Sequence, residues 1–576
     1  MLREYQLTNF KAFAGPETIP IRPITLIYGP NSSGKSSILQ SLLLLKQTLQ
    51  EAENPETLLL PKGNLVNLGG YREFIHRHDV SKSFSFKVVF GSHKEGTPNL
   101  FRNLVPDNLI ETPLLGLKVA FNYDRQMANA VLASVELFIG NDSSPVVIYK
   151  PEELANKNLA GDRFRSELGL GKRPLSDKIL KLEKINNDHE LWKAWWKKNE
   201  YNFNSHNLVI AEVKDTLQRS ELKEYLRKGW PKRLPRELHN LHEIFQEDLN
   251  KIDSRHNWQK SALQEQVRQI NYLIKLWQHF DKYTLDKAIE DLFKLTTYST
   301  IAYRFFLPIA SNEPGKPDFC EEEIVRLSRV YKRLNSTLDL SELTLLAAST
   351  FQGFLDTTIY IGPLREYPER LYILSGNSSQ QVGKSGKMLS DILFRNPELL
   401  KQVNEQLERF GLEYELKVAS YTNKETSELS DVFALRLVDK FTGVNVSLLD
   451  VGFGISQVLP IIVQSMLSRN TTLLIEQPEI HIHPRLQAEL GSLLAECIKP
   501  PLNNQFIIET HSEHLMLRLQ KLIRKGELKP EDVSVIYVDR AAEGSKCLHL
   551  RLDEEGDFID EWPGGFFEED FNEIFQ

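Results

Sequence analysis

A glycine-rich segment near the N-terminus has the residue types and spacing of a phosphate-binding loop. The segment GPNSSGKSS fits G-x-x-x-x-G-K-[ST] in full, with an apolar run before it and a leucine-rich run after it. Gly29 and Gly34 permit backbone angles that point several N–H groups inward, and the next helix N-terminus adds partial positive charge. Lys35 can then contact the terminal phosphates, while the Ser36 hydroxyl reaches Mg²⁺. We therefore predict a nucleoside triphosphate site formed by Gly29, Pro30, Asn31, Ser32, Ser33, Gly34, Lys35, Ser36 and Ser37.

A second candidate site is the segment TLLIEQPEIHIHP, residues 472–484. Its apolar start predicts a buried strand that ends at Glu476, which is our candidate for the carboxylate that holds Mg²⁺. The amide of Gln477 cannot accept a proton from water, so general-base catalysis there is excluded. Glu479 could supply a carboxylate to the attacking water, or it could only favour the N-terminus of a helix beginning near Pro484.

The same segment allows a different interpretation as a transition-metal site. Strict alternation would place Glu479, His481 and His483 on one face of a strand, which is a possible ligand set. This interpretation is the less favoured one, because no fourth ligand is in view.

The elements that must position these residues follow from the apolar patterns. Strands are expected at residues 5–10, 24–28, 84–90, 117–123, 131–139, 146–149, 359–363, 413–419, 432–438, 472–476, 505–509 and 533–538. Helices are expected at 36–50, within 387–407, and at 456–467, 484–498 and 512–525. Between about 165 and 350, strand signals mostly vanish and charged stretches with helical spacing take over: Glu183–Lys198, Trp258–Lys282 and Glu321–Leu334. The chain thus starts and ends on one α/β core that a helical insert interrupts.

Composition excludes several classes of protein. The net charge of 70 − 78 = −8 argues against a surface built wholly for nucleic acid, though not against one basic face. Three widely spaced cysteines form no C-x-x-C pair, which predicts a reducing compartment without structural zinc or disulfides. The start, MLREYQLTNFKAF, is not a signal peptide, and the longest leucine run is too short to span a bilayer. We expect a cytoplasmic protein with no membrane contact.

Five segments together resemble the ABC-type ATPase heads of the RecF/SMC-like and OLD-like group. They are LTNFKAF, GPNSSGKSS, LLDVGFGISQVLPIIVQ, LLIEQPEIHIHP and IIETHSEHL, and they cover roughly the first 90 and last 130 residues. The resemblance gives Glu476 the Walker B position and makes His511 the switch histidine. Gly454, Ser456 and Gln457 match the signature motif, in which Ser456 at a helix start would meet the γ-phosphate bound by the other subunit. Taken alone, Ser456 could instead cap its helix.

The resemblance also implies an organisation and a set of partners. We expect an ABC-type P-loop ATPase head with an antiparallel β lobe, interrupted by a large helical insertion. The domains would be residues 1–160 and 351–530 for the two parts of the head, 161–350 for the insertion, and 531–576 for a last strand and tail. ATP and Mg²⁺ would be the cofactors, with slow hydrolysis and a homodimer or higher even-numbered oligomer. The two histidines would then lie in a loop that crosses the dimer interface.

Other polar residues leave alternatives open. Arg365 and Arg370 could stabilise phosphate charge or tie down loop carboxylates such as Glu366. In the insert, tryptophans alternate with basic residues, and the cluster Arg227–Arg236 is a candidate nucleic-acid contact, although packing inside a helical domain explains most of them.

The C-terminal end bears on the effector. DEWPGGFFEEDFNEIF resembles the tail of a group of bacterial predicted ATPases, and only 576 − 538 = 38 residues follow the last expected strand. That is too few for the Toprim nuclease domain of OLD-family proteins. A separate nuclease or effector is therefore the expected partner, as in antiphage defence ATPases of the Septu type. The alternatives are a DNA repair or chromosome-maintenance ATPase and a non-hydrolysing ATP-binding scaffold.

Overall fold

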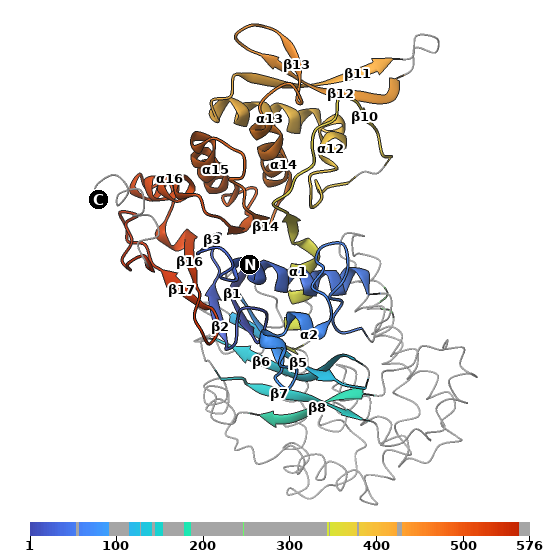
Figure 1. Cartoon of the computed structure of the whole chain (residues 1–576), viewed down its shortest axis with the longest axis vertical. Coiled ribbons are helices and arrows are strands. Elements are labelled where there is room, and N and C mark those ends of the chain that lie inside the picture. Colours follow the sequence, from blue (N-terminus) through green and yellow to red (C-terminus); the bar gives the residue numbers. More distant parts are fainter. Residues whose placement is uncertain are drawn as a thin grey trace, which may run out of the picture. The chain divides into compact units, whose positions relative to one another are not determined.

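The computed structural model describes residues 1–52, 57–91, 114–126, 128–140, 144–153, 178–185, 350–376, 379–422 and 429–563, with a few single positions between them (Figure 1). The chain divides into two compact units. One comprises Met1–Phe90, Val119–Ala133 and Phe354–Gln576, and the other comprises Gly91–Lys118 and Ser134–Gly353. Within the described ranges, no helix combines the length and apolar character that a membrane span requires.

A six-stranded sheet forms the centre of the first unit. Its strands lie in the order β17-β16-β3-β15-β14-β9. Their bounds are Lys546–Leu550, Val533–Asp539, Ile24–Tyr28, Gln505–Glu509, Thr472–Glu476 and Ile359–Ile361. All neighbours run parallel except β16 and β17. Every residue of β3, β14 and β15 is buried, as expected for uninterrupted apolar runs in a parallel sheet covered on both faces.

Helices follow the strand ends in the pattern that the sequence predicts. They are α1 (Lys35–Glu51), α14 (Phe453–Leu467), α15 (Pro484–Cys497) and α16 (Glu513–Arg524). The stretch expected to hold one helix within 387–407 holds two, α12 (Leu389–Arg395) and α13 (Pro397–Arg409). Asn396 between them is non-helical, with φ −128° and ψ 79°, because the residue before a proline is disfavoured in the α region.

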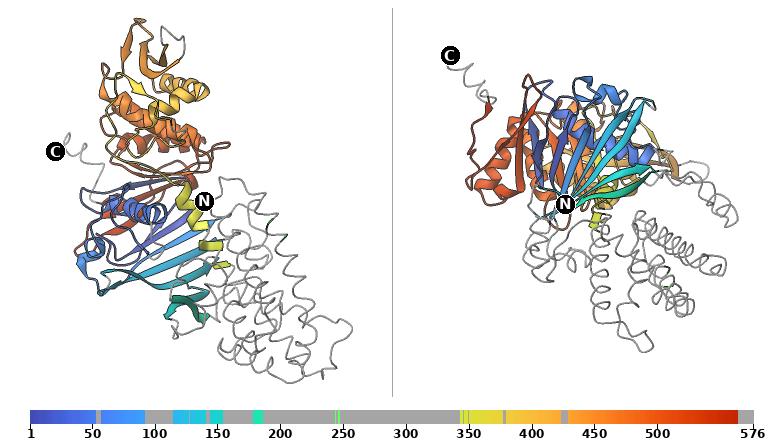
Figure 2. Two further views of the ribbon diagram at one scale, coloured as in Figure 1. Left: turned by 90° about the vertical axis from the view of Figure 1, so that its right-hand side faces the viewer. Right: turned by 90° about the horizontal axis from the view of Figure 1, so that it is seen from below.

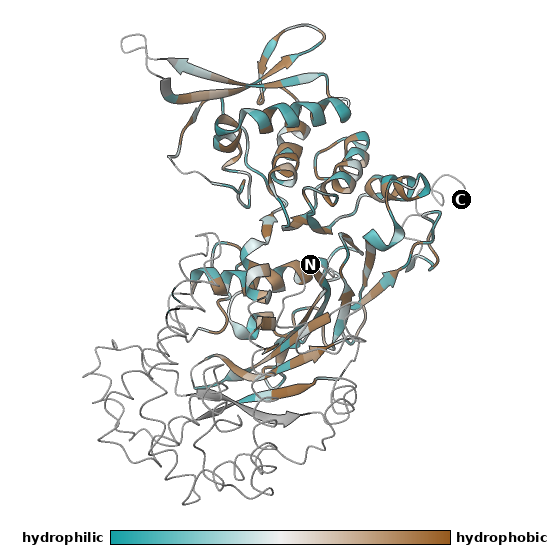
Figure 3. Ribbon diagram, turned by 180° about the vertical axis from the view of Figure 1, so that it is seen from behind, coloured by the Kyte–Doolittle hydropathy of each residue, from teal (hydrophilic) through white to brown (hydrophobic). Residues whose placement is uncertain are grey.

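The structure has two antiparallel sheets, and the seven-stranded one corresponds to the β lobe expected within residues 1–160. The seven-stranded sheet has the order β2-β1-β4-β5-β6-β7-β8, and its strands are the blue-to-green arrows in Figures 1 and 2. Its bounds in chain order are Leu2–Thr8, Glu17–Pro20, Phe84–Gly91, Leu114–Asp124, Asn129–Ile139, Val147–Glu153 and Lys178–Ile185. The four-stranded sheet contains β10 (Tyr372–Ile373), β11 (Tyr414–Thr422), β12 (Leu429–Asp439) and β13 (Asn445–Ser447). Helix α13 carries both apolar and polar residues (Figure 3), and it buries Leu399, Val403, Gln406 and Leu407.

The predicted helical insertion needs one correction. Strand β8 lies inside the range 161–350 and pairs antiparallel with β7, so residues 183–185 are strand, not the start of a helix. Pairing with a neighbouring strand outweighed the local helical spacing there. The other predicted helices of the insertion, its tryptophans and its basic cluster lie outside the described residues, as do the phenylalanines of the C-terminal tail.

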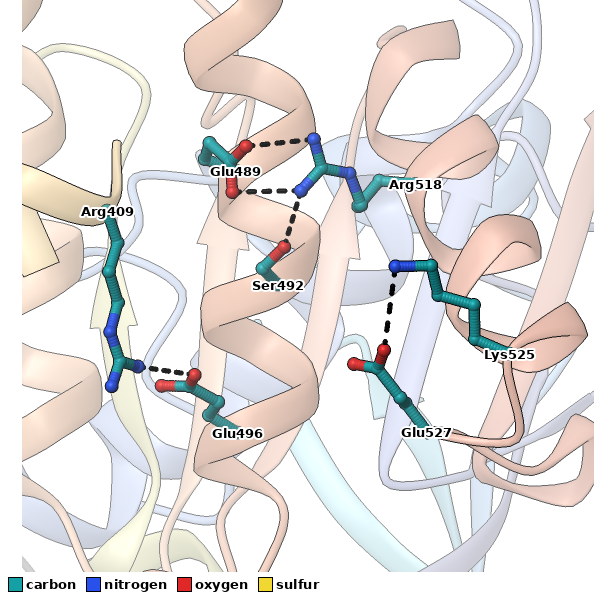
Figure 4. A network of polar contacts seen from close by, with 7 residues as sticks. All are labelled: Arg409, Glu489, Ser492, Glu496, Arg518, Lys525 and Glu527. Atoms are coloured by element: carbon teal, nitrogen blue, oxygen red, sulfur yellow. Dashed lines mark hydrogen bonds and ion pairs between the residues drawn. The ribbon is translucent and has the colours of Figure 1, made fainter. Parts of the chain in front are cut away.

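Helix α15 is held by charged side chains from two sides (Figure 4). Arg518 of α16 donates to both carboxylate oxygens of Glu489 at 2.8 and 2.9 Å and to the Ser492 hydroxyl at 2.7 Å. Arg409 of α13 donates to Glu496 at 2.5 Å from a more exposed position. The Arg518 side chain is only 21% exposed, so its pair is better shielded from water than the surface pairs around it.

We expect Arg518→Ala to lower the free energy of unfolding by about 1–3 kcal/mol, because Glu489 would stay partly buried without its partner. The control is Lys525→Ala, whose amine lies 3.7 Å from Glu527 on the surface and should matter by less than about 0.5 kcal/mol. Denaturant unfolding of the two variants and the wild type measures both effects. Equal losses in the two variants would contradict the prediction.

Candidate functional site

The loop from Gly29 to Ser37 has the conformation that its sequence predicts. Gly29 and Gly34 have φ angles of 139° and 108°, a region that favours glycine. A Cβ at Gly29 would lie 2.4 Å from the Val538 carbonyl oxygen, and one at Gly34 would lie 2.7 Å from the Ala12 Cβ. The two motif glycines are therefore required both by backbone angle and by space. The tip residues Pro30, Asn31 and Ser32 are exposed, whereas Ser33 and Ser37 are buried.

Lys35, the first residue of α1, lies at the centre of this loop. Its amine donates to the carbonyl oxygens of Gly29 at 2.9 Å and Pro30 at 2.8 Å, and the residue is 4% exposed. Burial lowers the pKa of Lys35, and the nearby carboxylates of Glu509 and Glu479 oppose that shift. The loop thus holds a cation where the motif predicts contact with phosphate.

The carboxylate beside Ser36 is that of Glu509, which the sequence motifs do not predict. The Ser36 hydroxyl donates to Glu509 Oε1 at 2.9 Å, at the end of β15. Glu476, the carboxylate expected to hold Mg²⁺, lies one strand farther from the loop, because β15 lies between β3 and β14 in the sheet. The sequence holds a signal that could have found it, because QFIIE ends a buried strand just as TLLIE does.

Glu476 lies next to Glu509 in the register of β14 and β15. Its Oε1 accepts a hydrogen bond from the Tyr360 hydroxyl at 3.0 Å, and the residue is 8% exposed. Burial, with repulsion from Glu509, raises the pKa of Glu476 to about 7, although Lys384 and Lys11 act in the opposite direction. Two carboxylates thus face the same edge of the sheet.

The turn after Glu476 is locked by its backbone. Gln477 has φ 46°, and its N–H donates to the Glu509 carbonyl oxygen at 2.8 Å. Arg365 donates from Nη2 to the carbonyl oxygens of Glu476 at 3.1 Å and Gln477 at 3.4 Å. Arg365 is 5% exposed, and burial lowers its pKa to about 10. For this arginine the structure shows a contact to the backbone of the turn after β14, which neither of the two expected roles included.

Arg370, by contrast, lies on the surface. Its guanidinium pairs with both carboxylate oxygens of Asp450 at 3.0 and 3.2 Å. Of the two roles expected for this arginine, the structure shows the ion pair with a loop carboxylate, and that carboxylate is Asp450.

Glu479 connects the segments that follow β14 and β15. Its Oε1 accepts the His511 N–H at 2.7 Å, and its Oε2 accepts the Thr510 hydroxyl at 2.7 Å. Burial raises the pKa of Glu479, and these hydrogen bonds partly offset the shift. For His511, burial and the charge of Lys35 lower the pKa, which favours the neutral imidazole.

The strand geometry assumed for a transition-metal site is wrong. Residues 477–483 form a turn, with a left-handed φ of 64° at His481, so Glu479, His481 and His483 do not share one strand face. His483 instead caps α15, where its Nδ1 accepts the Arg485 N–H at 3.2 Å. Across the ranges that the structure describes, no three histidine, cysteine or acidic side chains form a metal-binding group.

The helix expected at 456–467 also starts earlier than predicted. Helix α14 begins at Phe453 after the N-cap Gly452, so Ser456 neither opens nor caps it. Ser456 and Gln457 are 7% and 2% exposed. Gly454 packs against the turn after β14, where a Cβ would lie 3.0 Å from the His481 carbonyl oxygen. The free N–H groups of the first turn therefore belong to residues before Ser456.

The hairpin between β16 and β17 forms hydrogen bonds to the loop 29–37 and to the segment before it. Ser545 donates from its hydroxyl to the Ser33 carbonyl oxygen at 2.5 Å and from its backbone N–H to the Ala12 carbonyl oxygen at 2.8 Å. Farther along, Trp562 packs edge-on against Tyr28, with ring centroids 5.5 Å apart. The C-terminal region thus contacts the loop and the strand that leads into it.

Comparisons with known proteins bear on the site. A family model described as "AAA ATPase domain" matches residues 1–516, and one described as "Protein of unknown function (DUF3696)" matches residues 528–576. No curated protein matches the chain.

Solved structures that match include SMC head domains. A Smc head domain derived from Pyrococcus furiosus, bound to the C-terminal domain of ScpA, is 12% identical, with 96% of each chain covered and a TM-score of 0.32. The SMC head domain from Thermotoga maritima is 9% identical, with 96% of this chain and 99% of that chain covered and a TM-score of 0.32.

We expect Glu476→Gln to stabilise the metal-free protein at pH 8 by about 1–3 kcal/mol. The raised pKa means that the folded state binds a proton more readily than the unfolded state, whose glutamate titrates near 4.3. Wild-type stability should therefore fall as pH rises from about 4.5 to about 7, and the variant should lose this part of the dependence. Denaturant unfolding in EDTA at pH 5 and pH 8 tests it. If the variant is less stable than the wild type at pH 8, burial does not destabilise the charged Glu476 carboxylate and the prediction is wrong.

We expect Ser545→Ala to weaken nucleotide binding by about 3–10-fold, because the loop would lose one buried hydrogen bond to Ser33. Ser534→Ala is the matched control, since its hydroxyl donates to the Pro20 carbonyl oxygen at 2.7 Å at the other end of β16. Titration with a fluorescent ADP analogue measures both affinities. If the two variants bind the analogue equally well, the Ser545 hydroxyl does not support nucleotide binding through Ser33.

Proposed function

Because the chain belongs to the AAA ATPase domain family, we propose that it binds ATP at the loop 29–37 and hydrolyses it slowly to control its own association. The observation that carries this proposal is the buried Lys35 amine inside the loop, next to the Ser36 hydroxyl and the carboxylate of Glu509. Cation, hydroxyl and carboxylate are the groups that bind a triphosphate with its metal. We place this activity in the cytoplasm.

The donors at the site fit a hard divalent cation such as Mg²⁺. Ser36, Glu476 and Glu509 offer oxygen atoms, which Mg²⁺ prefers, and it commonly binds through one or two carboxylates plus substrate phosphates. When bound, the cation neutralises charge on the phosphates. The chain's own part is to hold Lys35 and the loop N–H groups against those phosphates and to exclude water from the strand ends.

Slow turnover follows from the groups around the Walker B turn. Gln477 has no basic carboxylate, and both oxygens of Glu479 accept hydrogen bonds from Thr510 and His511. In our proposal Glu479 positions the switch segment and is not the general base. His511, kept neutral, can then hydrogen-bond to a γ-phosphate or to the attacking water.

The ATP-bound form would be a head-to-head homodimer. In each half, phosphates on the loop of one copy would meet the start of α14 from the other copy. The support is the helix N-terminus at Gly452–Gly454, because its free N–H groups suit an anion. Hydrolysis or loss of nucleotide would release the two copies, so the γ-phosphate biases a two-state equilibrium.

The signal would pass to a separate effector, a nuclease of an antiphage defence system. The sequence resemblance to defence ATPases supports this step. Co-purification of such a nuclease with the chain tests it directly.

We expect Lys35→Ala to reduce phosphate release from ATP by about 100-fold or more, because the cation inside the loop is lost. The control is Lys401→Ala on the exposed side of α13, which should keep full activity. Light scattering after gel filtration with a slowly hydrolysed ATP analogue should show a dimer for wild type and control but not for Lys35→Ala. Unchanged phosphate release by Lys35→Ala would disprove the ATPase assignment, and a monomer in every sample would disprove the dimer.

A further inference from the structure

We propose that Glu509 is a direct carboxylate ligand of the divalent cation at the phosphate loop, together with Ser36. This inference rests on the proposed nucleotide binding and adds a ligand that the motifs do not name, since they assign the metal carboxylate to Glu476. Three independent features of the structure support it.

The first feature is position. Strand β15 lies between β3, which leads into the loop, and β14, which ends at Glu476. The register places Glu509 opposite Ile27 on one side and Glu476 on the other. The Thr510 N–H donates to the Ile27 carbonyl oxygen at 3.1 Å, and the Gln477 N–H donates to the Glu509 carbonyl oxygen at 2.8 Å. Both neighbouring strands therefore hold the backbone that carries this carboxylate.

The second feature is a difference in hydrogen bonding between the two Glu509 carboxylate oxygens. Oε1 accepts the Ser36 hydroxyl at 2.9 Å. Oε2 is buried, and within the described residues it has no hydrogen-bond donor, although Glu509 is only 4% exposed. Buried carboxylate oxygens are normally paired with a donor or a cation, because an unpaired one loses its hydration without compensation. An oxygen of this kind, on a side chain already touching Ser36, fits a metal ligand.

The third feature is the contrast with Glu476. Its Oε1 accepts a hydrogen bond from the buried Tyr360 hydroxyl, and its lysine neighbours are Lys384 and Lys11, whereas the lysine beside Glu509 is Lys35 of the loop itself. Glu509 instead faces Ser36, whose hydroxyl is the metal ligand in this loop motif. One cation near both carboxylates would offset their mutual repulsion. We assign the direct contact to Glu509 and the supporting charge to Glu476.

The test uses Mn²⁺ as the metal probe and ADP as the nucleotide. Electron paramagnetic resonance counts free Mn²⁺ during titration into ADP-loaded protein, and a fluorescent ADP analogue in EDTA reports nucleotide affinity without metal. Glu509→Gln keeps the shape and the acceptor for Ser36 while removing the charge. We expect it to weaken Mn²⁺ binding by about tenfold or more, while metal-free ADP affinity changes by less than about threefold.

Three further variants make the result decisive. Glu509→Asp restores the charge on a shorter side chain and should recover part of the Mn²⁺ affinity that Glu509→Gln loses. Glu476→Gln should weaken Mn²⁺ binding less than Glu509→Gln does. Glu527→Gln, on the exposed surface, should bind Mn²⁺ like the wild type.

The outcomes separate this inference from the proposed function. Wild-type protein that binds no ADP would overturn the proposed function itself. If ADP binds but Glu509→Gln holds Mn²⁺ as wild type does, Glu509 is not a ligand. If Glu509→Gln and Glu509→Asp lose metal-free ADP binding as well as Mn²⁺, the residue is structural and the inference fails.

Discussion

The candidate site depends on one constraint, the shared edge at which three parallel strands end. Strands β3, β15 and β14 are fully buried and lie side by side, so their carboxyl ends meet at one place. The loop that begins at Gly29, the carboxylate of Glu509 and the carboxylate of Glu476 all leave the sheet there. Ligands bind at such edges in open α/β sheets because the side chains of several loops converge while the strands keep them rigid.

Gathering charge at this edge is unfavourable unless it is compensated. Three carboxylates, Glu476, Glu479 and Glu509, each have a raised pKa because burial disfavours their charged forms. Hydrogen bonds offset part of this cost: Tyr360 donates to Glu476, and Ser36 to Glu509. Both Glu479 oxygens accept hydrogen bonds from the segment that carries His511. The strain at Gln477, with its positive φ, fits a site held in place by the structure around it.

The described residues from 533 to 563 belong to the architecture of the site. Strand β16 pairs with β3, and Ser545 contacts Ser33 across 512 residues of sequence. The close approach of Val538 to Gly29 explains why that position requires glycine. Segments near the two ends of the chain therefore jointly fix the conformation of the loop 29–37.

Much of the α/β core could be predicted from the sequence. Strands 24–28, 472–476 and 505–509 have the expected bounds, and the fold class is confirmed, because long apolar runs and glycine spacing act locally. Three predictions from local patterns were wrong. Pro397 divides a region expected to hold one helix, residues 178–185 form a strand, and α14 starts before residue 456.

What the sequence by itself determined is the chemistry of the loop, since Gly29, Gly34, Lys35 and Ser36 lie within one short segment whose backbone angles are set locally. Which carboxylate faces Ser36 was decided only by the tertiary structure. Glu509 lies 473 residues from Ser36, and its place follows from the order of strands in the sheet. The same holds for Glu479, whose two oxygens bind Thr510 and His511 only because β14 and β15 are neighbours. Strand order depends on packing between distant segments, and no local pattern encodes it.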